Sequence, residues 1–311
     1  MNFPSPSSAG AVISVTTLSR RFGAKQALDD VTLHVPRGCV FGLVGENGAG
    51  KTTLIKHLLG LLKAESGTVR VFGRDPVADP VGVLGRIGYL SEYRDLPVWM
   101  RVDELLNYTR AFYPRWDPHY AEELREQFGL DPEQRVRSLS QGQQAKAGLL
   151  LALAFRPELL LLDEPSSGLD PVVRRDILEA IIRTVAEEGR TVFFSSHLLD
   201  EIERVCDQLA MIRDGRIVLC GRLDDIKQGH RQLVVRFDHA PGSPPRFDHT
   251  LSLRGSGREW TLLCTGERGR VMKQLSAAGA RVLAEQTPSL DDIFVAQAAR
   301  RPSREPLESA A

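Results

Sequence analysis

The chain has little cysteine, no excess of either charge and no long apolar run, and each shortage excludes a class of protein. Its four cysteines show no C-x-x-C spacing and lie mostly within apolar runs, which favours buried free thiols over a zinc site or a disulfide framework. Lysine plus arginine and aspartate plus glutamate number 40 each, so no bulk charge favours nucleic acid or an anionic membrane, and we expect no nucleic-acid partner. The longest apolar stretches fall far short of a bilayer span, which indicates a soluble protein of the cytosol.

Length and composition allow one large core and a small second domain. The chain has 311 residues, of which 42% are hydrophobic and 26% charged, and this composition is typical of a globular protein. Residues 1–10 lack the basic and hydrophobic regions of a signal peptide, so we expect a short flexible arm. At the other end, we expect residues 300–311 to form a disordered tail.

The most specific motif is the glycine-rich sequence GENGAGKT at residues 45–52, which directly follows the apolar run of residues 39–44. In this position a buried strand leads into a loop whose backbone N–H groups surround phosphates, and residues 53–59 continue as a helix whose N-terminus faces the anion. The alternative is an ordinary glycine-rich turn, which the complete motif between a strand and a helix disfavours. The sequence therefore predicts a nucleotide-binding phosphate loop.

Two side chains of this loop carry charge or bind metal. Lys51 places a positive charge at the phosphates. The Thr52 hydroxyl is the expected Mg²⁺ ligand, because Mg²⁺ keeps several waters and takes only one or two protein oxygens beside the phosphates. The residues of the loop expected to hold the nucleotide are Gly45, Asn47, Gly48, Gly50, Lys51, Thr52 and Thr53.

A second candidate catalytic motif follows the apolar run of residues 159–162, which ends in two carboxylates. Asp163 is placed to hold Mg²⁺ through its water shell, as the strand-end aspartate does in phosphate-loop nucleotidases. Glu164 is one residue further on and can reach a different position, where it would polarise the water that attacks the γ-phosphate. The alternative is an acidic pair that stabilises a helix N-terminus. The phosphate loop favours the catalytic interpretation.

Hydrophobic patterns predict an α/β core. The apolar runs at residues 40–44, 159–162 and 192–194 are typical of parallel strands covered by helices on both faces. Residues 12–18 and 31–35 alternate like half-exposed strands and indicate an antiparallel flank.

The remaining patterns predict a helical insertion and a hairpin. Residues 102–155 contain mainly helical patterns, so we expect an inserted helical lobe over about residues 92–157. Two apolar runs flank Asp214 and Gly215, a pair that supplies the positive φ angles of a tight turn. The fold class is therefore α/β, a phosphate-loop NTPase core with an antiparallel β flank and an inserted helical lobe.

Three further segments make the prediction more specific: LSQGQ at residues 139–143, SSGLDP at residues 166–171, and SSH at residues 195–197. With the two blocks above, they resemble in order the motifs of the ATP-binding cassette (ABC) ATPases, from Phe22 to about Gly221. The resemblance implies that the chain binds ATP and Mg²⁺ and hydrolyses ATP. It also implies a nucleotide-binding domain over residues 11–229.

The resemblance assigns roles to the new segments. Ser140, Gly142 and Gln143 belong to the signature loop, which contacts the γ-phosphate of ATP held by a second subunit. We expect this loop to open a helix over residues 144–155, whose N-terminus suits an anion. Taken alone, the pentapeptide is more typical of a helix cap. Asp170 lies in the segment that the family uses to communicate across the dimer.

Two more residues match family positions near the nucleotide. His197 corresponds to the switch histidine that senses the γ-phosphate, and it follows a strand beside the phosphate-loop strand, at the edge where parallel strands gather ligand-binding groups. A lone histidine is otherwise usually structural. Phe22 matches the aromatic that stacks on adenine, although it could equally be a core phenylalanine.

The sequence departs from the family pattern at two positions. Glu92 stands where the family usually has glutamine, in the loop that joins the core to the helical lobe. Its carboxylate can still approach Mg²⁺ or water, so we expect ATPase activity to be retained. Gln141 stands where the commonest signature has glycine, but Ser140 and Gly142 remain, so contact with phosphate is not excluded.

The motifs stop beyond Gly221. Strand patterns at residues 232–237, 250–253 and 260–264 and helical patterns at residues 268–278 and 290–299 predict a small α+β domain over residues 230–299. Its ending resembles the C-terminal domain of many cassette subunits of bacterial export-type transporters, although a capped amphipathic helix would also produce this pattern.

Together these features predict the ATP-hydrolysing motor subunit of a membrane transporter, an exporter by the C-terminal resemblance. Two identical or similar cassettes would close on ATP, and separate permease subunits would hold the chain at the cytoplasmic face of the cell membrane. The apolar loop at residues 92–104 is the expected docking surface, unless its side chains pack the lobe. The alternative is a soluble cassette ATPase that acts on ribosomes, nucleic acid or a regulatory partner. Against it, the chain has one cassette, no heptad arms and no basic block. A non-hydrolysing sensor is disfavoured by Glu164 and His197.

Overall fold

The computed structural model describes residues 10–93, 95–186 and 189–299. The chain divides into two compact units, Met1–Leu223 and Asp224–Ala311. The division falls slightly before the domain boundary expected at residue 229. The expected tail, and the expected arm apart from Gly10, lie outside the described residues.

A six-stranded sheet forms the centre of the first unit, in the order β5-β6-β7-β3-β8-β9. The pairs β5/β6, β6/β7, β7/β3 and β3/β8 are parallel, and only β8/β9 is antiparallel. Every residue of β3, β6 and β7 is buried, which explains why these strands are continuous apolar runs. The strands are β3 (Val40–Val44), β5 (Ile87–Leu90), β6 (Leu159–Asp163), β7 (Thr191–Ser196), β8 (Gln208–Arg213) and β9 (Arg216–Arg222).

The hairpin predicted at Asp214 and Gly215 joins β8 to β9. Both residues have positive φ, 49° and 77°, and Arg213 pairs with Arg216 across the turn. The prediction from the Asp-Gly pair is confirmed.

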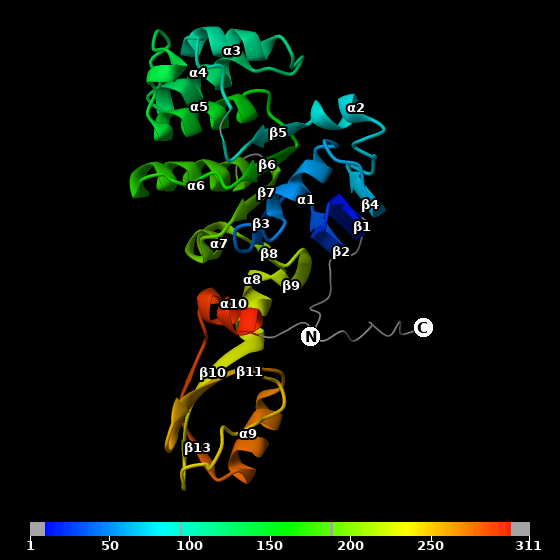
Figure 1. Ribbon diagram of the computed structural model, residues 1–311. Coiled ribbons are helices and arrows are strands. Elements are labelled where there is room, and N and C mark those ends of the chain that lie inside the picture. The colour runs from blue at the N-terminus through cyan, green and yellow to red at the C-terminus, as the bar shows by residue number, and fades with distance from the viewer. Residues whose placement is uncertain (1–9, 94, 187–188, 300–311) are drawn as a thin grey trace. The chain divides into compact units, whose positions relative to one another are not determined.

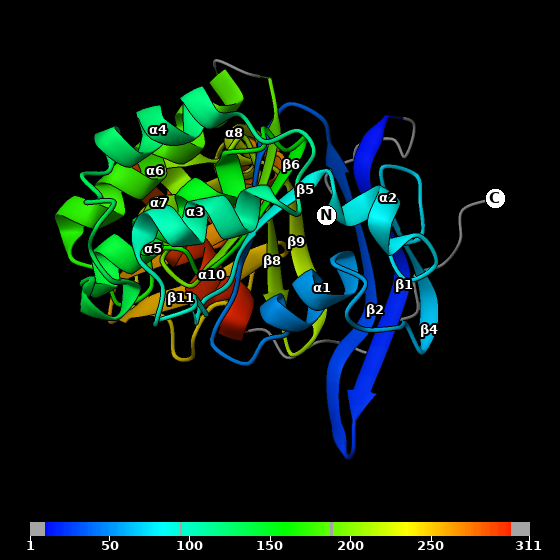
Figure 2. The same cartoon turned by 90° about the horizontal axis from the view of Figure 1, so that it is seen from above.

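The predicted antiparallel flank is a separate three-stranded sheet, in the order β2-β1-β4. Its strands are β1 (Ala11–Phe22), β2 (Lys25–Pro36) and β4 (Ser66–Val71), and α1 (Lys51–Leu58) contacts both this sheet and the central sheet (Figure 2). Leu54 and Ile55 of α1 share one buried cluster with Phe41 and Phe193 of the central sheet. The helix behind the phosphate loop is thus fixed on two sides.

The predicted helical lobe consists of α3 (Val102–Arg110), α4 (Pro118–Gln127) and α5 (Gln141–Leu153), which lie together in Figure 1. Helix α5 begins at Gln141, earlier than the expected residue 144, because Ser140 caps it. The lobe packs closely on the edge of the central sheet. A Cβ atom on Gly88 of β5 would lie 2.2 Å from the carbonyl oxygen of Ala152, so only glycine allows this approach.

Further helices complete the first unit. Helices α6 (Pro171–Ala186) and α7 (Leu199–Val205) contact β3 and β7 of the central sheet, while the short α2 (Pro80–Leu84) contacts β5. Within the part of the chain that is described, no helix is long and apolar enough to cross a membrane.

The second unit is a four-stranded antiparallel sheet with three helices, in agreement with the predicted α+β pattern. Its strand order is β11-β12-β10-β13, and Leu233 and Val235 of β10 pack against Val271 and Leu275 of α9. Helix α8 and strand β13 were not predicted. The elements are α8 (Leu223–Gly229), β10 (His230–Phe237), β11 (Thr250–Ser256), β12 (Glu259–Thr265), α9 (Arg268–Ala277), β13 (Ala280–Gln286) and α10 (Leu290–Ala299).

Candidate functional site

The phosphate loop joins the end of β3 to the start of α1, as predicted. Gly50 has a φ of 115°, and a Cβ atom on it would lie 2.6 Å from the carbonyl oxygen of Ala27. A Cβ atom on Gly45 would lie 2.4 Å from the carbonyl oxygen of Ile212. No side chain caps the N-terminus of α1, so its first N–H groups remain available to an anion.

Lys51 is buried within this loop and holds it from inside. Its Nζ donates to the carbonyl oxygens of Gly45 and Glu46 at 2.5 and 3.1 Å. The same ammonium lies 3.0 Å from Oε1 of Glu164, and both side chains are only 5% exposed. The two predicted catalytic groups therefore form a buried ion pair.

Asp163 lies at the end of β6 and is 1% exposed. Its Oδ1 accepts a hydrogen bond from the hydroxyl of Ser195 at 2.7 Å. Burial raises the pKa of Asp163 above its usual value, although the hydroxyls of Ser195 and Thr52 oppose the shift. The two predicted metal ligands, Thr52 and Asp163, thus lie near each other.

Glu164 follows in an unusual backbone conformation, with a φ of 49°. Its N–H donates to the Ser195 hydroxyl at 3.0 Å, and its Oε2 lies 2.8 Å from Nδ1 of His197. A positive φ is uncommon outside glycine and is found at functional sites when the surroundings fix it. The structure therefore brings Glu164, His197 and Lys51 together, as a hydrolytic site requires.

A cavity of about 480 Å³ opens in front of these groups, and Phe22, Gly48, Lys51 and Glu92 are among the residues that line it. Phe22 is 44% exposed, which disfavours the alternative of a core phenylalanine. The guanidinium of Arg20 lies 4.8 Å from the centre of its ring. The cavity has the aromatic side chain, the glycine loop and the cation that a nucleotide needs.

Sequence reasoning did not place Lys25, Ala27 or Lys56 at this cavity, and it assigned Tyr93 only to the docking loop, but all four residues line it. Lys25 starts β2, and its Nζ lies 3.7 Å from the position of a Cβ atom on Gly48. The position of Lys25 shortly after Phe22 in the sequence was the only signal that could have indicated this residue. Lys25 and Lys56 add positive charge around the phosphate loop, where a nucleotide would bring negative charge.

The predicted Mg²⁺ ligands also share one space. Thr52, Glu92 and Asp163 line a cavity of about 440 Å³. Among the residues that the structure describes, no cluster of three histidine, cysteine or acidic side chains could hold a metal on its own. A hydroxyl and carboxylates beside a phosphate site fit Mg²⁺, because this ion is held by few protein oxygens and by substrate phosphates.

The signature segment does not line the cavity beside Lys51. Ser140 and Gln143 form a capping box at the start of α5, with N–H to oxygen distances of 3.2 and 2.9 Å. The helix cap, which the sequence left as an alternative, is therefore present. Gly142 is needed for packing, since a Cβ atom on it would lie 2.8 Å from Cγ2 of Val173.

Asp170 has a similar local role at the start of α6. Its Oδ1 accepts the N–H groups of Val172 and Val173 at 3.0 and 3.1 Å. The residue is exposed, as is Ser140. Within one chain, these residues thus cap helices and leave polar groups on the surface.

The central sheet, the phosphate loop and the carboxylates at the end of β6 define a phosphate-loop ATPase. Comparison with known proteins agrees. Residues 28–167 match the family model described as ABC transporter. The chain is 30% identical to the ABC transporter ATP-binding protein YtrB of Bacillus subtilis (strain 168), over 92% of this chain and 98% of that protein.

Two further comparisons extend the match. The chain is 32% identical to the Nod factor export ATP-binding protein I of Rhizobium johnstonii, over 95% of this chain and 97% of that protein. A solved structure described as an ATP binding subunit of ABC transporter is similar with a TM-score of 0.64 and 30% identity, over 70% of this chain and 92% of that one. The chain belongs to the ATP-binding subunits of the ABC transporter family, and it is an ATPase.

The buried carboxyl of Asp163 leads to a testable expectation. We expect Asp163→Asn to stabilise the nucleotide-free protein at pH 7.5, because the amide keeps the acceptor oxygen without a buried charge. A carboxyl with a raised pKa binds its proton more tightly in the folded chain, so the wild type loses stability as pH rises above about 3.8, the usual value. The gain in free energy of unfolding from Asp163→Asn should become smaller as pH falls.

Urea unfolding of both proteins between pH 4.5 and 7.5 measures this difference. The same variant should lose Mg²⁺-dependent ATP binding. Equal stability of the two proteins at every pH would contradict the assignment of a destabilising charge to Asp163.

Proposed function

We propose that the chain is the motor subunit of an ABC exporter, in which two cassettes close on ATP and act on separate permease subunits. The observation that carries this proposal is the division of the site. Lys51, Glu164 and His197 converge beside one cavity, while Ser140 and Gln143 present polar groups outside it. A second subunit, identical or closely related, would supply its Ser140–Gln143 segment to this cavity.

The roles within the cavity follow from the geometry. Phe22 would stack on the adenine, and the phosphate loop from Gly45 to Thr53 would surround the phosphates. When bound, Mg²⁺ neutralises phosphate charge, and Thr52, Asp163 and Glu92 would hold it. In the free chain Lys51 pairs with Glu164, and phosphates would give Lys51 another anionic partner.

Release of Lys51 would leave Glu164 as an anionic base beside His197. The carboxylate could then accept a proton from the attacking water, while His197 keeps contact with its Oε2 at the 2.8 Å found here. Hydrolysis would therefore depend on the presence of the phosphates.

Removing the charge of Glu164 tests this assignment. We expect Glu164→Gln to lower ATP turnover about 100-fold or more, which is typical of losing a general base. Because ATP then persists, the variant should elute as a dimer with Mg-ATP on size-exclusion chromatography. The exposed Glu126→Gln, in the helical lobe, is a matched control. Unchanged turnover together with no dimer would overturn the proposed role of Glu164.

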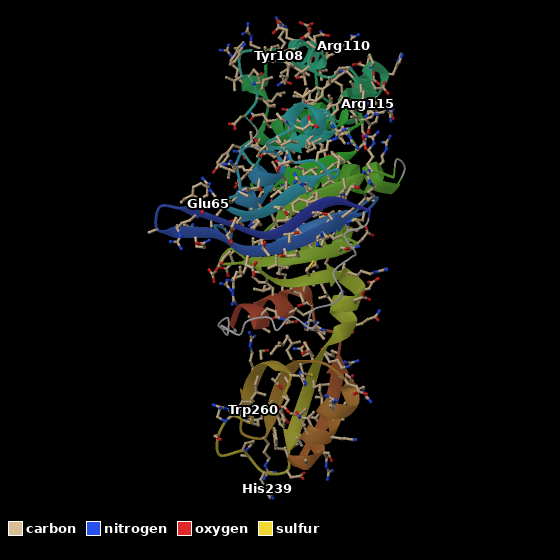
Figure 3. All side chains as sticks on the ribbon, turned by 90° about the vertical axis from the view of Figure 1, so that its right-hand side faces the viewer. Glu65, Tyr108, Arg110, Arg115, His239 and Trp260 are labelled. Atoms are coloured by element: carbon tan, nitrogen blue, oxygen red, sulfur yellow. The ribbon has the colours of Figure 1, made fainter. Side chains whose placement is uncertain are left out.

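The proposed docking surface lies on the helical lobe and the loop before it. Tyr93, Val98 and Trp99 are 79%, 52% and 67% exposed, so these apolar side chains do not pack the lobe. Tyr108, on the part of the lobe far from the central sheet in Figure 3, is 52% exposed. Val98 and Trp99 are neighbours in the chain, and adjoining exposed apolar side chains are typical of a protein contact. A permease bound here would place the chain at the cytoplasmic face of the membrane.

A charge on this surface tests the docking. We expect Trp99→Glu to leave the ATPase activity of the purified chain unchanged, but to reduce at least fivefold the amount of polytopic membrane protein that co-purifies from detergent-solubilised native membranes. Val81→Glu is the control, because Val81 is also apolar and is 85% exposed, but it lies in α2, outside the lobe. Equal capture by both variants would contradict docking at Trp99. Capture of ribosomal or other soluble partners alone would contradict the transporter.

The direction of transport is supported by similarity. The Rhizobium relative is named for Nod factor export and matches this chain over nearly its whole length, including the second unit. We propose export for this chain on that ground.

A further inference from the structure

A second buried carboxylate, Glu201 of α7, lies behind the hydrolytic residues. It is 1% exposed, and its Oε2 accepts two hydrogen bonds, from the hydroxyl of Ser166 at 2.7 Å and from that of Ser196 at 2.8 Å. Its Oε1 lies 3.3 Å from Nε of Arg174. Acidic side chains are rarely so buried unless they are paired, and here three polar groups converge on one carboxylate.

The two serines belong to the loops that carry the hydrolytic pair. Ser166 lies two residues after Glu164, and Ser196 directly precedes His197. Both serines are 1% exposed. The hydroxyl of Ser196 also accepts the N–H of Leu198 at 3.0 Å, so it fixes the backbone on both sides of the histidine. One carboxylate oxygen therefore connects the segment after Glu164 to the segment around His197.

The hydrogen bonds from Ser166 and Ser196 to Glu201 are strong enough to fix the positions of the two segments that they join. Hydrogen bonds to a charged acceptor are shorter and about twice as strong as neutral ones, and a low local dielectric strengthens them further. The contact that they support is the 2.8 Å contact between Glu164 and His197. A misplacement of about 1 Å at a reacting group can lower a rate about 100-fold.

We propose that Glu201 is a positioning residue for ATP hydrolysis, which holds Glu164 and His197 in register through Ser166 and Ser196. Arg174 balances its charge from α6. Glu201 itself does not reach the nucleotide cavity, so its effect is on the rate of hydrolysis and not on ATP affinity. This inference rests on the hydrolytic roles proposed above for Glu164 and His197.

Three variants test it. In Glu201→Gln an amide NH₂ replaces one carboxylate oxygen, so the side chain cannot serve both serines and Arg174. Ser166→Ala removes the bond to Glu201 alone, and Ser196→Ala removes both the bond to Glu201 and the bond from the N–H of Leu198, each with little change in volume. The control is Asp200→Asn, because Asp200 is the neighbouring carboxylate of α7 and is exposed.

We expect Glu201→Gln to lower kcat about 10- to 100-fold, with KM and the Kd for ATP within about twofold of wild type, and Asp200→Asn to change nothing. The kcat is calculated per ATP-binding site, from the stoichiometry of ATP binding, so unfolded protein does not affect it. A merely structural role of Glu201 would lower the stoichiometry of ATP binding together with the rate per mole of chain. Each serine variant should lower kcat. In the double variant, the fold reduction in kcat should be smaller than the product of the two single fold reductions.

The outcomes separate this inference from the proposed function. If Glu164→Gln abolishes turnover while Glu201→Gln and both serine variants keep wild-type kcat, the positioning role is wrong and the proposed function stands. If Glu164→Gln keeps turnover, the proposed function itself fails. If ATP binding and kcat fall together in every variant, Glu201 only stabilises the folded core and the positioning role is wrong.

Discussion

The site depends on one interaction, the ion pair between Lys51 and Glu164. Both groups are buried, and a buried charge without a partner is strongly destabilising. With a distance of 3.0 Å, each is the counter-ion that the other requires while no phosphate is present. The pair links the loop after β3 to the end of β6. The ion pair therefore compensates the charges of Lys51 and Glu164 beside the cavity while both side chains stay buried.

The central sheet makes this arrangement possible. Strands β6 and β3 both pair with β7, so the ends that carry Asp163, Lys51 and His197 meet at one edge. Neighbouring residues of a strand point to opposite sides, and two serines at the end of β7 use this alternation. The Ser195 hydroxyl contacts Asp163 and the N–H of Glu164, whereas the Ser196 hydroxyl contacts Glu201. The end of β7 thus contacts the Asp163–Glu164 segment through Ser195 and Glu201 of α7 through Ser196.

Local signals were enough for much of the fold and for the residues around the cavity. Buried apolar runs, the Asp-Gly turn and the ordered motifs placed β3, β6, β7 and the hairpin, because burial on both faces and positive φ leave direct traces in sequence. Strand β13 leaves none, since four of its seven residues are exposed and two half-buried, and only pairing with β10 makes it a strand. Lys25 and Glu201 were missed for a similar reason, because Gly48 is distant from Lys25 in the chain, and Ser166 and Arg174 are distant from Glu201. A carboxylate in a polar helix such as α7 resembles any exposed one.

The first turn of α6 is where the surface of the chain and its hydrolytic loops meet. Asp170 caps this turn through the N–H of Val173, and the Val173 side chain packs against Gly142 of the signature segment. The next residue, Arg174, pairs with Glu201. Consecutive residues of one rigid turn therefore contact both the segment proposed for a second subunit and the carboxylate behind Glu164. Since a helical turn moves as a unit, a shift at the subunit surface would reach the hydrolytic pair through side chains already in contact.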